Sequence, residues 1–258
     1  DLEGMPVVVA DLHSSLPAVL AGLRSPDGQE QPRIVYIMTD GGALPLAYSR
    51  VVTALREAGW LAGTVTAGQA WGGDIEAVSI HNALLAARHV LHADAAIVIQ
   101  GPGNLGTETP WGFSGVACGD AVNAIAALGG RPVACLRVSQ ADARPRHRGV
   151  SHHSMTAYGR VALAAADVVV PGLDGPSGTR VRREADVLCA PRRGAAQHRL
   201  IEIPSGGLLE RLHAAEEEVG VRLSTMGRGL EEDAAAFLAA AAAGRHVRRI
   251  LDEEAVNG

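Results

Sequence analysis

The sequence contains no lysine, so every one of its 23 Lys+Arg residues is an arginine. This absence excludes the phosphate-binding lysine of P-loop NTPases, a Schiff base to pyridoxal phosphate and catalysis by a lysine base. Positive charge at a binding site must therefore come from arginine, histidine, a metal ion or the N-termini of helices. The residue types present are compatible with a divalent metal ion as a cofactor.

Other features are scarce as well. Aromatic residues make up 3% of the chain against 47% hydrophobic residues, which predicts a core of Ala, Val, Leu and Ile. Three cysteines without CxxC spacing favour free thiols in the cytoplasm over a disulfide scaffold. No apolar run has the length of a membrane span, and a net charge of −5 without a long basic run argues against nucleic acid as a partner. A homo-oligomer stays open.

Short apolar runs alternate with helical patterns along the whole chain, without an internal repeat. The runs that predict strands are Pro6–Asp11, Arg33–Met38, Thr64–Ala67, Ala95–Ile99, Arg131–Val138, Asp167–Val170, His198–Ile203 and Val221–Ser224. Helical patterns include Leu44–Ala58, Ile75–His92 and Leu208–Val219, while Arg180–Arg193 is ambiguous between helix and strand. We expect one doubly wound α/β domain over residues 1–258, with a mostly parallel sheet and helices on both faces.

Polar loops follow the carboxyl ends of the predicted strands, whereas the loops at the opposite ends are short and plain. Ligands of open α/β sheets bind at that edge, so the asymmetry predicts a ligand site there. We expect one cleft lined by Asp40, Asp74, Asn104, Thr107, His152 and Arg228.

A glycine-rich loop, GPGNLGTETPWGFSG, follows the uncharged run at Ala95–Ile99. Gly101, Gly103 and Gly106 match the GxGxxG pattern, but Pro110 and Gly112 delay the next helix, which argues against classical NAD binding. A cradle for phosphate or carboxylate and a purely structural turn both stay open. We expect valine at Gly103 or Gly106 to remove ligand binding, because glycine there permits a positive φ or a close backbone approach.

Histidines and acids from several loops form a possible metal-ligand set of Asp11, His13 and His153. Adjacent helical residues diverge by about 100°, so we expect only one of His152 and His153 to reach a shared ion. Helix capping or anion binding by Ser151–Ser154 is the alternative.

Candidate roles follow from residue chemistry. Asp40 and Asp74 are the candidate general acid and base, because each follows a strand beside glycines, and His152 is the alternative base. Arg148 and Arg228 are the candidate anion clamps, since the guanidinium fork matches phosphate and carboxylate. The further candidate ligand-binding residues are Gly41, Gly42, Gly73, Gly101, Gly103, Asn104, Gly106, Thr107, Ser151 and Thr225.

Several motifs together resemble one family. TDGGALP, GQAWGGDIEAV, GPGNLGTETPWGFSG, RHRGVSHHS and LSTMGRGL cover nearly the whole chain and are similar to the bacterial domain-of-unknown-function family 3866. The resemblance implies a further N-terminal segment, so we expect this chain to be the C-terminal part of a longer protein. It implies no reaction.

These observations predict a hydrolase or group transferase that acts on a small anionic substrate, phosphorylated or nucleotide-like. The alternative is a non-catalytic module that senses a ligand or binds a protein through the same glycine-rich cleft. A histidine or carboxylate with a strongly shifted pKa inside the cleft would favour the enzyme. An apolar cleft with its ionisable groups paired outward would favour the sensor.

Overall fold

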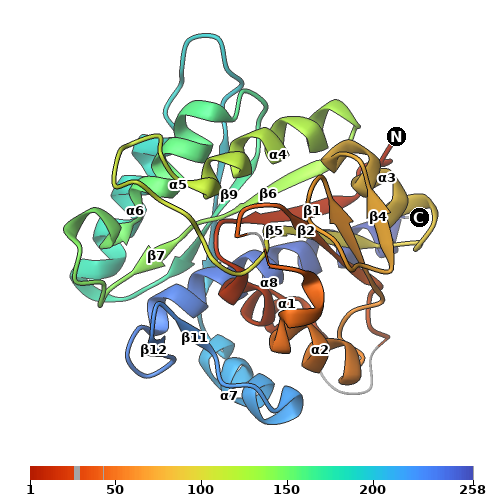
Figure 1. The fold of residues 1–258 in the computed structure, drawn as a ribbon. Helices are drawn as coiled ribbons and strands as arrows, with labels where there is room; N and C mark the ends of the chain where they lie inside the picture. The colour runs from red at the N-terminus through yellow and green to blue at the C-terminus, as the bar shows by residue number, and fades with distance from the viewer. Residues whose placement is uncertain (26–29, 43, 258) are drawn as a thin grey trace.

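The central element of the computed structural model, which describes residues 1–25, 30–42 and 44–257, is an eight-stranded sheet (Figure 1). Its strand order is β10-β9-β6-β1-β5-β2-β3-β4, and every neighbouring pair is parallel. The strands are β1 (Pro6–Ala10), β2 (Ile34–Thr39), β3 (Gly63–Ala67), β4 (Ile75–Ala77), β5 (Ala95–Gln100), β6 (Arg131–Cys135), β9 (Asp167–Gly172) and β10 (Arg199–Pro204). The expected α/β class is therefore confirmed.

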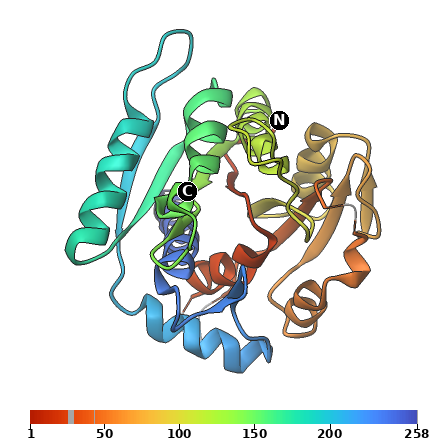
Figure 2. The same cartoon turned by 60° about the vertical axis from the view of Figure 1, so that its left-hand side comes forward.

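Helices cover both faces of this sheet (Figures 1 and 2). One face packs against α1 (Leu16–Leu23), α2 (Arg50–Glu57), α7 (Leu208–Val219) and α8 (Ala234–Asn257). The other packs against α3 (Ile80–His89), α4 (Ala117–Ala127), α5 (His152–Thr156), the π-helix η5 (Ala157–Val161) and α6 (Gly175–Cys189). The short elements are η1 (His13–Ser15), η2 (Leu46–Tyr48), η3 (Ser114–Val116), η4 (Pro145–His147) and the two-stranded pairs β7–β8 (Val138–Ser139, Gly149–Val150) and β11–β12 (Ser224–Thr225, Arg228–Gly229).

The direction of the chain reverses around β1. The chain leaves β1 through α1 on one face and returns from β5 through α4 on the other, although β1 and β5 are neighbours. The loops that follow the two strands therefore separate to opposite faces. Such a switch in strand order opens a crevice at the carboxyl edge, where open α/β sheets bind ligands.

Small residues allow α1 and α8, which lie near opposite ends of the chain, to pack closely. A Cβ atom at Gly22 of α1 would overlap the carbonyl oxygen of Ala241 in α8, and one at Gly244 would overlap that of Val19. The alanine-rich α8 thus fills much of this core with small side chains, although its Phe237 is buried there as well. Among the described residues, no helix combines the length and the apolar character that crossing a membrane requires.

Two local predictions are wrong, and one stretch that the sequence leaves open is a helix. Ile75–Ala77 forms the edge strand β4, so the next helix begins at Ile80 and not at Ile75. The ambiguous stretch Arg180–Arg193 lies largely in α6, whose Val181, Ala185 and Leu188 are buried at helical spacing. The expected strand Val221–Ser224 does not join the central sheet, because Ser224 and Thr225 instead pair with Arg228 and Gly229 in a small hairpin.

Candidate functional site

Asp11 lies at the centre of a polar cluster, one residue beyond the carboxyl end of β1. Only 5% of it is exposed. Asn104 Nδ2 donates to Asp11 Oδ1 at 2.8 Å, and Arg137 Nη1 donates to Oδ2 at 3.1 Å. The Nδ1 atom of His153 lies 2.9 Å from the same Oδ2. Three segments far apart in the sequence are therefore joined by one carboxylate.

The close approach of the glycine-rich loop to Asp11 depends on Gly115. A Cβ atom at this position would overlap Asp11 Oδ1. Burial by itself would raise the pKa of Asp11, but hydrogen bonding to His153 and the positive charge of Arg137 lower it below its usual value. Asp11 is thus a carboxylate at neutral pH and compensates the buried charge of Arg137.

Segment 137–151 brings α5 to this carboxylate. The chain leaves β6, pairs Val138 with Val150 and returns, so that Ser151 N donates to Arg137 O at 2.8 Å. Ser154 Oγ then accepts from Arg137 N at 2.9 Å. From η5, the buried hydroxyl of Tyr158 donates to Val9 O at 2.7 Å. These bonds hold the first turn of α5 against the carboxyl ends of β1 and β6.

Three histidines meet beside Asp11. His147, His152 and His153 offer ring nitrogens that all lie within 4.8 Å of one another. The centroids of the adjacent His152 and His153 rings are 4.5 Å apart, so the expectation that the two diverge is wrong. The cause is packing: His153 stacks on Phe113 at 3.8 Å and His152 packs against His147 at 4.9 Å, which turns both rings into one pocket.

The histidines line a cavity of about 210 Å³ at the carboxyl edge of the sheet. Asn104, Gly106 and Phe113 line one side, and Arg137, Arg144 and Arg146 contribute guanidinium groups. Burial, together with the charges of Arg137 and Arg144, lowers the pKa of His147 to about 3. Burial, His153 and Arg146 lower the pKa of His152 to about 4. Both rings are therefore neutral at pH 7, so each has one ring nitrogen whose lone pair can accept a hydrogen bond or bind a metal ion.

Asp40 lies at the same edge but lines another cavity, of about 400 Å³, with Gly41, Gly42, Gly101 and Trp71. Its carboxylate accepts from Gln69 N at 3.2 Å. A Cβ atom at Gly42 would overlap Pro102 O, so this glycine lets the loops after β2 and β5 touch. The structure does not bring Asp40 into the histidine pocket.

Asp74 lies at the opposite edge of the sheet, so the single cleft expected from the sequence is wrong. It directly precedes β4, which runs parallel to β3, and the chain must return to the amino end of β3 before β4 can begin. There Asp74 Oδ2 accepts from Thr64 N at 2.8 Å, and Oδ1 pairs with Arg56 at 2.7 Å. Gly73 passes alongside β3, where a Cβ atom would lie 2.8 Å from Thr66 N.

The glycine-rich loop folds back on itself. Thr107 N donates to Gly112 O at 2.7 Å, and Gly106 forms an isolated bridge with Phe113. Gly103 has a φ of 94°, as expected for an obligatory glycine. Gly106 has no positive φ, and a Cβ atom there would meet nothing closer than 3.7 Å. The structure therefore gives a reason for valine to disturb the loop at Gly103. It gives no such reason at Gly106.

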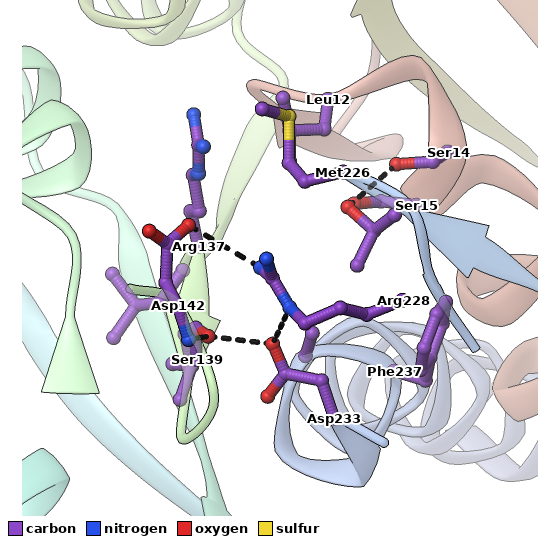
Figure 3. Close-up of a pocket in the computed structure, with 14 residues that line it drawn as sticks. Leu12, Ser14, Ser15, Arg137, Ser139, Asp142, Met226, Arg228, Asp233 and Phe237 are labelled. Carbon is purple, nitrogen blue, oxygen red and sulfur yellow. Dashed lines mark hydrogen bonds and ion pairs between the residues drawn. The ribbon is translucent and has the colours of Figure 1, made fainter. Parts of the chain in front are cut away.

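Arg228 lies between two carboxylates (Figure 3). Its Nη2 is 3.2 Å from Asp142 Oδ2, and its Nε is 3.0 Å from Asp233 Oδ2. Both acids are buried, so the guanidinium is already compensated and holds the start of α8 to the loop after β7. The cavity beside it, which Thr225 also lines, has a volume of about 20 Å³, enough for one water molecule and too small for a substrate.

The remaining candidates have structural partners. Exposed Arg148 donates through Nε to Asp142 O at 2.7 Å. Ser151 is fully buried, and its Oγ lies 2.7 Å from His147 Nδ1. His13 faces away from His153 and lies between Tyr36 Oη at 3.1 Å and Ser49 Oγ at 2.7 Å. Asp11 and His13 thus do not share one ion with His153.

Sequence reasoning missed Arg137, His147 and Phe113 as site residues. Arg137 was hidden inside a predicted strand, yet it is the only charged residue in the apolar run after Arg131, which is a usable signal. Gln100 was missed as well, although a polar residue ends the run AAIVIQ; its Nε2 donates to Asp11 O at 2.8 Å. Phe113 carries no signal of its own, because its role depends on stacking with His153.

Comparison with known proteins gives a family and no activity. A family model described as protein of unknown function (DUF3866) matches residues 1–244. The chain belongs to this family. Neither a curated protein nor a solved structure matches the chain.

Proposed function

We propose that the protein is a hydrolase or group transferase that acts on a small anionic substrate, of the phosphate-ester class, in the histidine pocket. The observation that carries this proposal is the buried Asp11, which holds His153 and Arg137 at a cavity that His147 and His152 also line. Structural ion pairs do not need an open cavity, whereas catalytic ones do. The site therefore moves from the expected Asp40–Asp74 pair to the loops after β1, β5 and β6.

Three guanidinium groups supply the attraction for an anion. Each already has a carboxylate partner: Arg137 pairs with Asp11, Arg144 with Asp142 and Arg146 with Glu108. A guanidinium carries five N–H donors, so donors remain for a phosphate oxygen after one such pairing. The neutral imidazoles of His147 and His152 then face the bound group and can take up a proton or polarise water through an ion.

Strongly shifted histidine pKa values inside a polar cavity favour the enzyme over the sensor. Burial lowers the pKa of His152 to about 4, so its ring is neutral at pH 7, the form in which an imidazole nitrogen binds a metal ion. The three free, buried cysteines fit a reducing compartment, and we place the protein in the cytoplasm with a small molecule, not nucleic acid or membrane, as its partner.

Turnover of a panel of phosphate monoesters and nucleotides, followed by release of inorganic phosphate, tests this proposal. We expect His152→Ala to lower kcat at least about 100-fold, as for general acid–base or metal-assisted chemistry. Arg146→Ala should weaken binding by about 1.5–3 kcal/mol, the range for a hydrogen bond to a charged group. The exposed Arg193→Ala is the matched control.

Asp40→Asn separates the two cavities. It should leave turnover nearly unchanged, because Asp40 lines the neighbouring cavity. Tight binding of an anion without turnover in the unmutated protein would favour the sensor, and loss of turnover in Asp40→Asn alone would return the site to the loop after β2.

A further inference from the structure

We propose that His147, His152 and His153 bind a first-row divalent transition metal of the zinc class. The three rings come from η4 and the first turn of α5 and line one face of the 210 Å³ cavity. Three imidazoles with an open fourth position are a standard catalytic zinc set. Imidazole nitrogens select zinc, copper, iron or nickel over magnesium and calcium, which prefer oxygen ligands.

The ring nitrogens are already close to coordination distance. In a tetrahedral site with a Zn–N distance of about 2.1 Å, ligand nitrogens stand about 3.4 Å apart. The three nitrogens lie within 4.8 Å of one another, so each pair needs to approach by at most about 1.4 Å. His147 is buried, whereas His152 and His153 are half-buried, so rotation of these two rings can supply this movement without a change of the backbone.

The Nδ1 atoms of two of the proposed ligands, His153 and His147, have hydrogen-bond partners outside the cavity. His153 Nδ1 faces Asp11 Oδ2 at 2.9 Å, and His147 Nδ1 faces Ser151 Oγ at 2.7 Å. Ionised Asp11 can only accept, so His153 Nδ1 is the donor and its Nε2 carries the lone pair. The Ser151 hydroxyl, which also accepts from His153 N at 3.2 Å, can donate to His147 Nδ1 or accept from it, so it orients that ring without setting its tautomer. Carboxylate–histidine–metal arrangements of this kind orient the ring and raise its basicity, and their loss typically costs 10–100-fold in metal affinity. The contact with Asp11 therefore fixes the tautomer of His153 in the form that metal binding through Nε2 requires.

The charges around the cavity are compatible with a cation. Arg137, Arg144 and Arg146 line it, but each is paired with a carboxylate, Asp11, Asp142 or Glu108. Asp11 and Asp142 are buried, so dissolved salt screens their attraction to the arginines only weakly. The ion would hold water or one substrate oxygen at its open position, with the guanidinium groups on the remaining anion oxygens.

The catalytic use of the metal rests on the proposed function, whereas its binding does not. The direct test is therefore titration of tag-free, chelator-treated protein with Co²⁺, followed by its visible absorption. We expect one Co²⁺ per chain with a spectrum typical of nitrogen ligands. His147→Ala and His152→Gln should weaken binding by more than about 100-fold, and Ser151→Ala by about 10-fold. The exposed His81→Ala is the control, and an excess of Mg²⁺ should not compete.

The outcomes separate the two proposals. Unchanged Co²⁺ affinity in a His152→Gln variant that keeps its melting temperature would overturn the metal site, as would a thiolate charge-transfer band from the cysteines. Turnover by the metal-free protein at the rate of the loaded protein would overturn the catalytic role of the metal and leave the proposed function standing. Binding of Co²⁺ by a protein that binds no anion would support the metal site and overturn the function.

Discussion

Asp11 and His13 are two residues apart after β1, yet they face opposite sides of it and are held by different forces. Asp11 faces β6, where it is ionised and bonded to Arg137 and His153. His13 faces β2, where it lies between the hydroxyls of Tyr36 and Ser49. Because the Tyr36 hydroxyl donates to Ile99 O, His13 Nδ1 must donate to Tyr36, and a neutral ring satisfies every partner.

The difference shows which side of β1 keeps charged groups at an open cavity and which side does not. The β2 side uses neutral hydrogen bonds to fix a loop, and it tolerates exposed acids such as Asp40. The β6 side keeps charges and imidazoles beside an open cavity, which demands compensation by buried partners. We therefore place function on the β6 side and support on the β2 side.

The largest effect that sharpens this comparison sets Asp11 against Asp74, an acid at the opposite edge of the sheet and outside the histidine pocket. Asp11→Asn leaves the buried guanidinium of Arg137 without its carboxylate, so we expect a loss of about 3–5 kcal/mol in the free energy of unfolding. Asp74→Asn removes a half-exposed pair with Arg56 and should cost about 1 kcal/mol or less. Urea denaturation of both variants measures the difference. Equal losses would mean that Asp11 is not specially buried or paired.

A smaller effect concerns His13 and pH. Burial lowers the pKa of His13 to about 4. Its unfolded-state pKa is about 6.5, so between these values the unfolded state binds a proton that the folded state refuses. Stability is therefore full above pH 6.5 and falls as the pH is lowered toward 4, by about 3 kcal/mol from this residue.

His13→Gln should remove that part of the decline, while the exposed His81→Gln should keep it. Denaturation curves from pH 7 to pH 4 compare the two variants with the unmutated protein. A His13→Gln variant that loses stability with the unmutated slope would show that His13 is protonated in the folded protein and that the β2 side is not neutral.

The sheet could be predicted from the sequence because buried parallel strands are continuous apolar runs, such as AAIVIQ and RPVAC. The same pattern predicted a ligand site at the carboxyl edge, where the candidate site proposed above lies. The partners of each residue could not be predicted, because they depend on strand order. Asp74 was predicted at the wrong edge, because the strand β4 that follows it is only three residues long. Arg228 was predicted to bind an anion, but its ion-pair partners are Asp142 and Asp233. His152 and His153 converge only through packing on Phe113 and His147.

The position of a bound anion tests the central claim most directly. Tungstate mimics phosphate and is located by its anomalous scattering in a crystal soaked with it. We predict one tungstate in the histidine pocket, within hydrogen-bond distance of Arg137, Arg144 or Arg146 and facing His147 and His152. A tungstate in the cavity of Asp40 and Trp71, with the histidine pocket empty, would contradict the assignment of function to the β6 side.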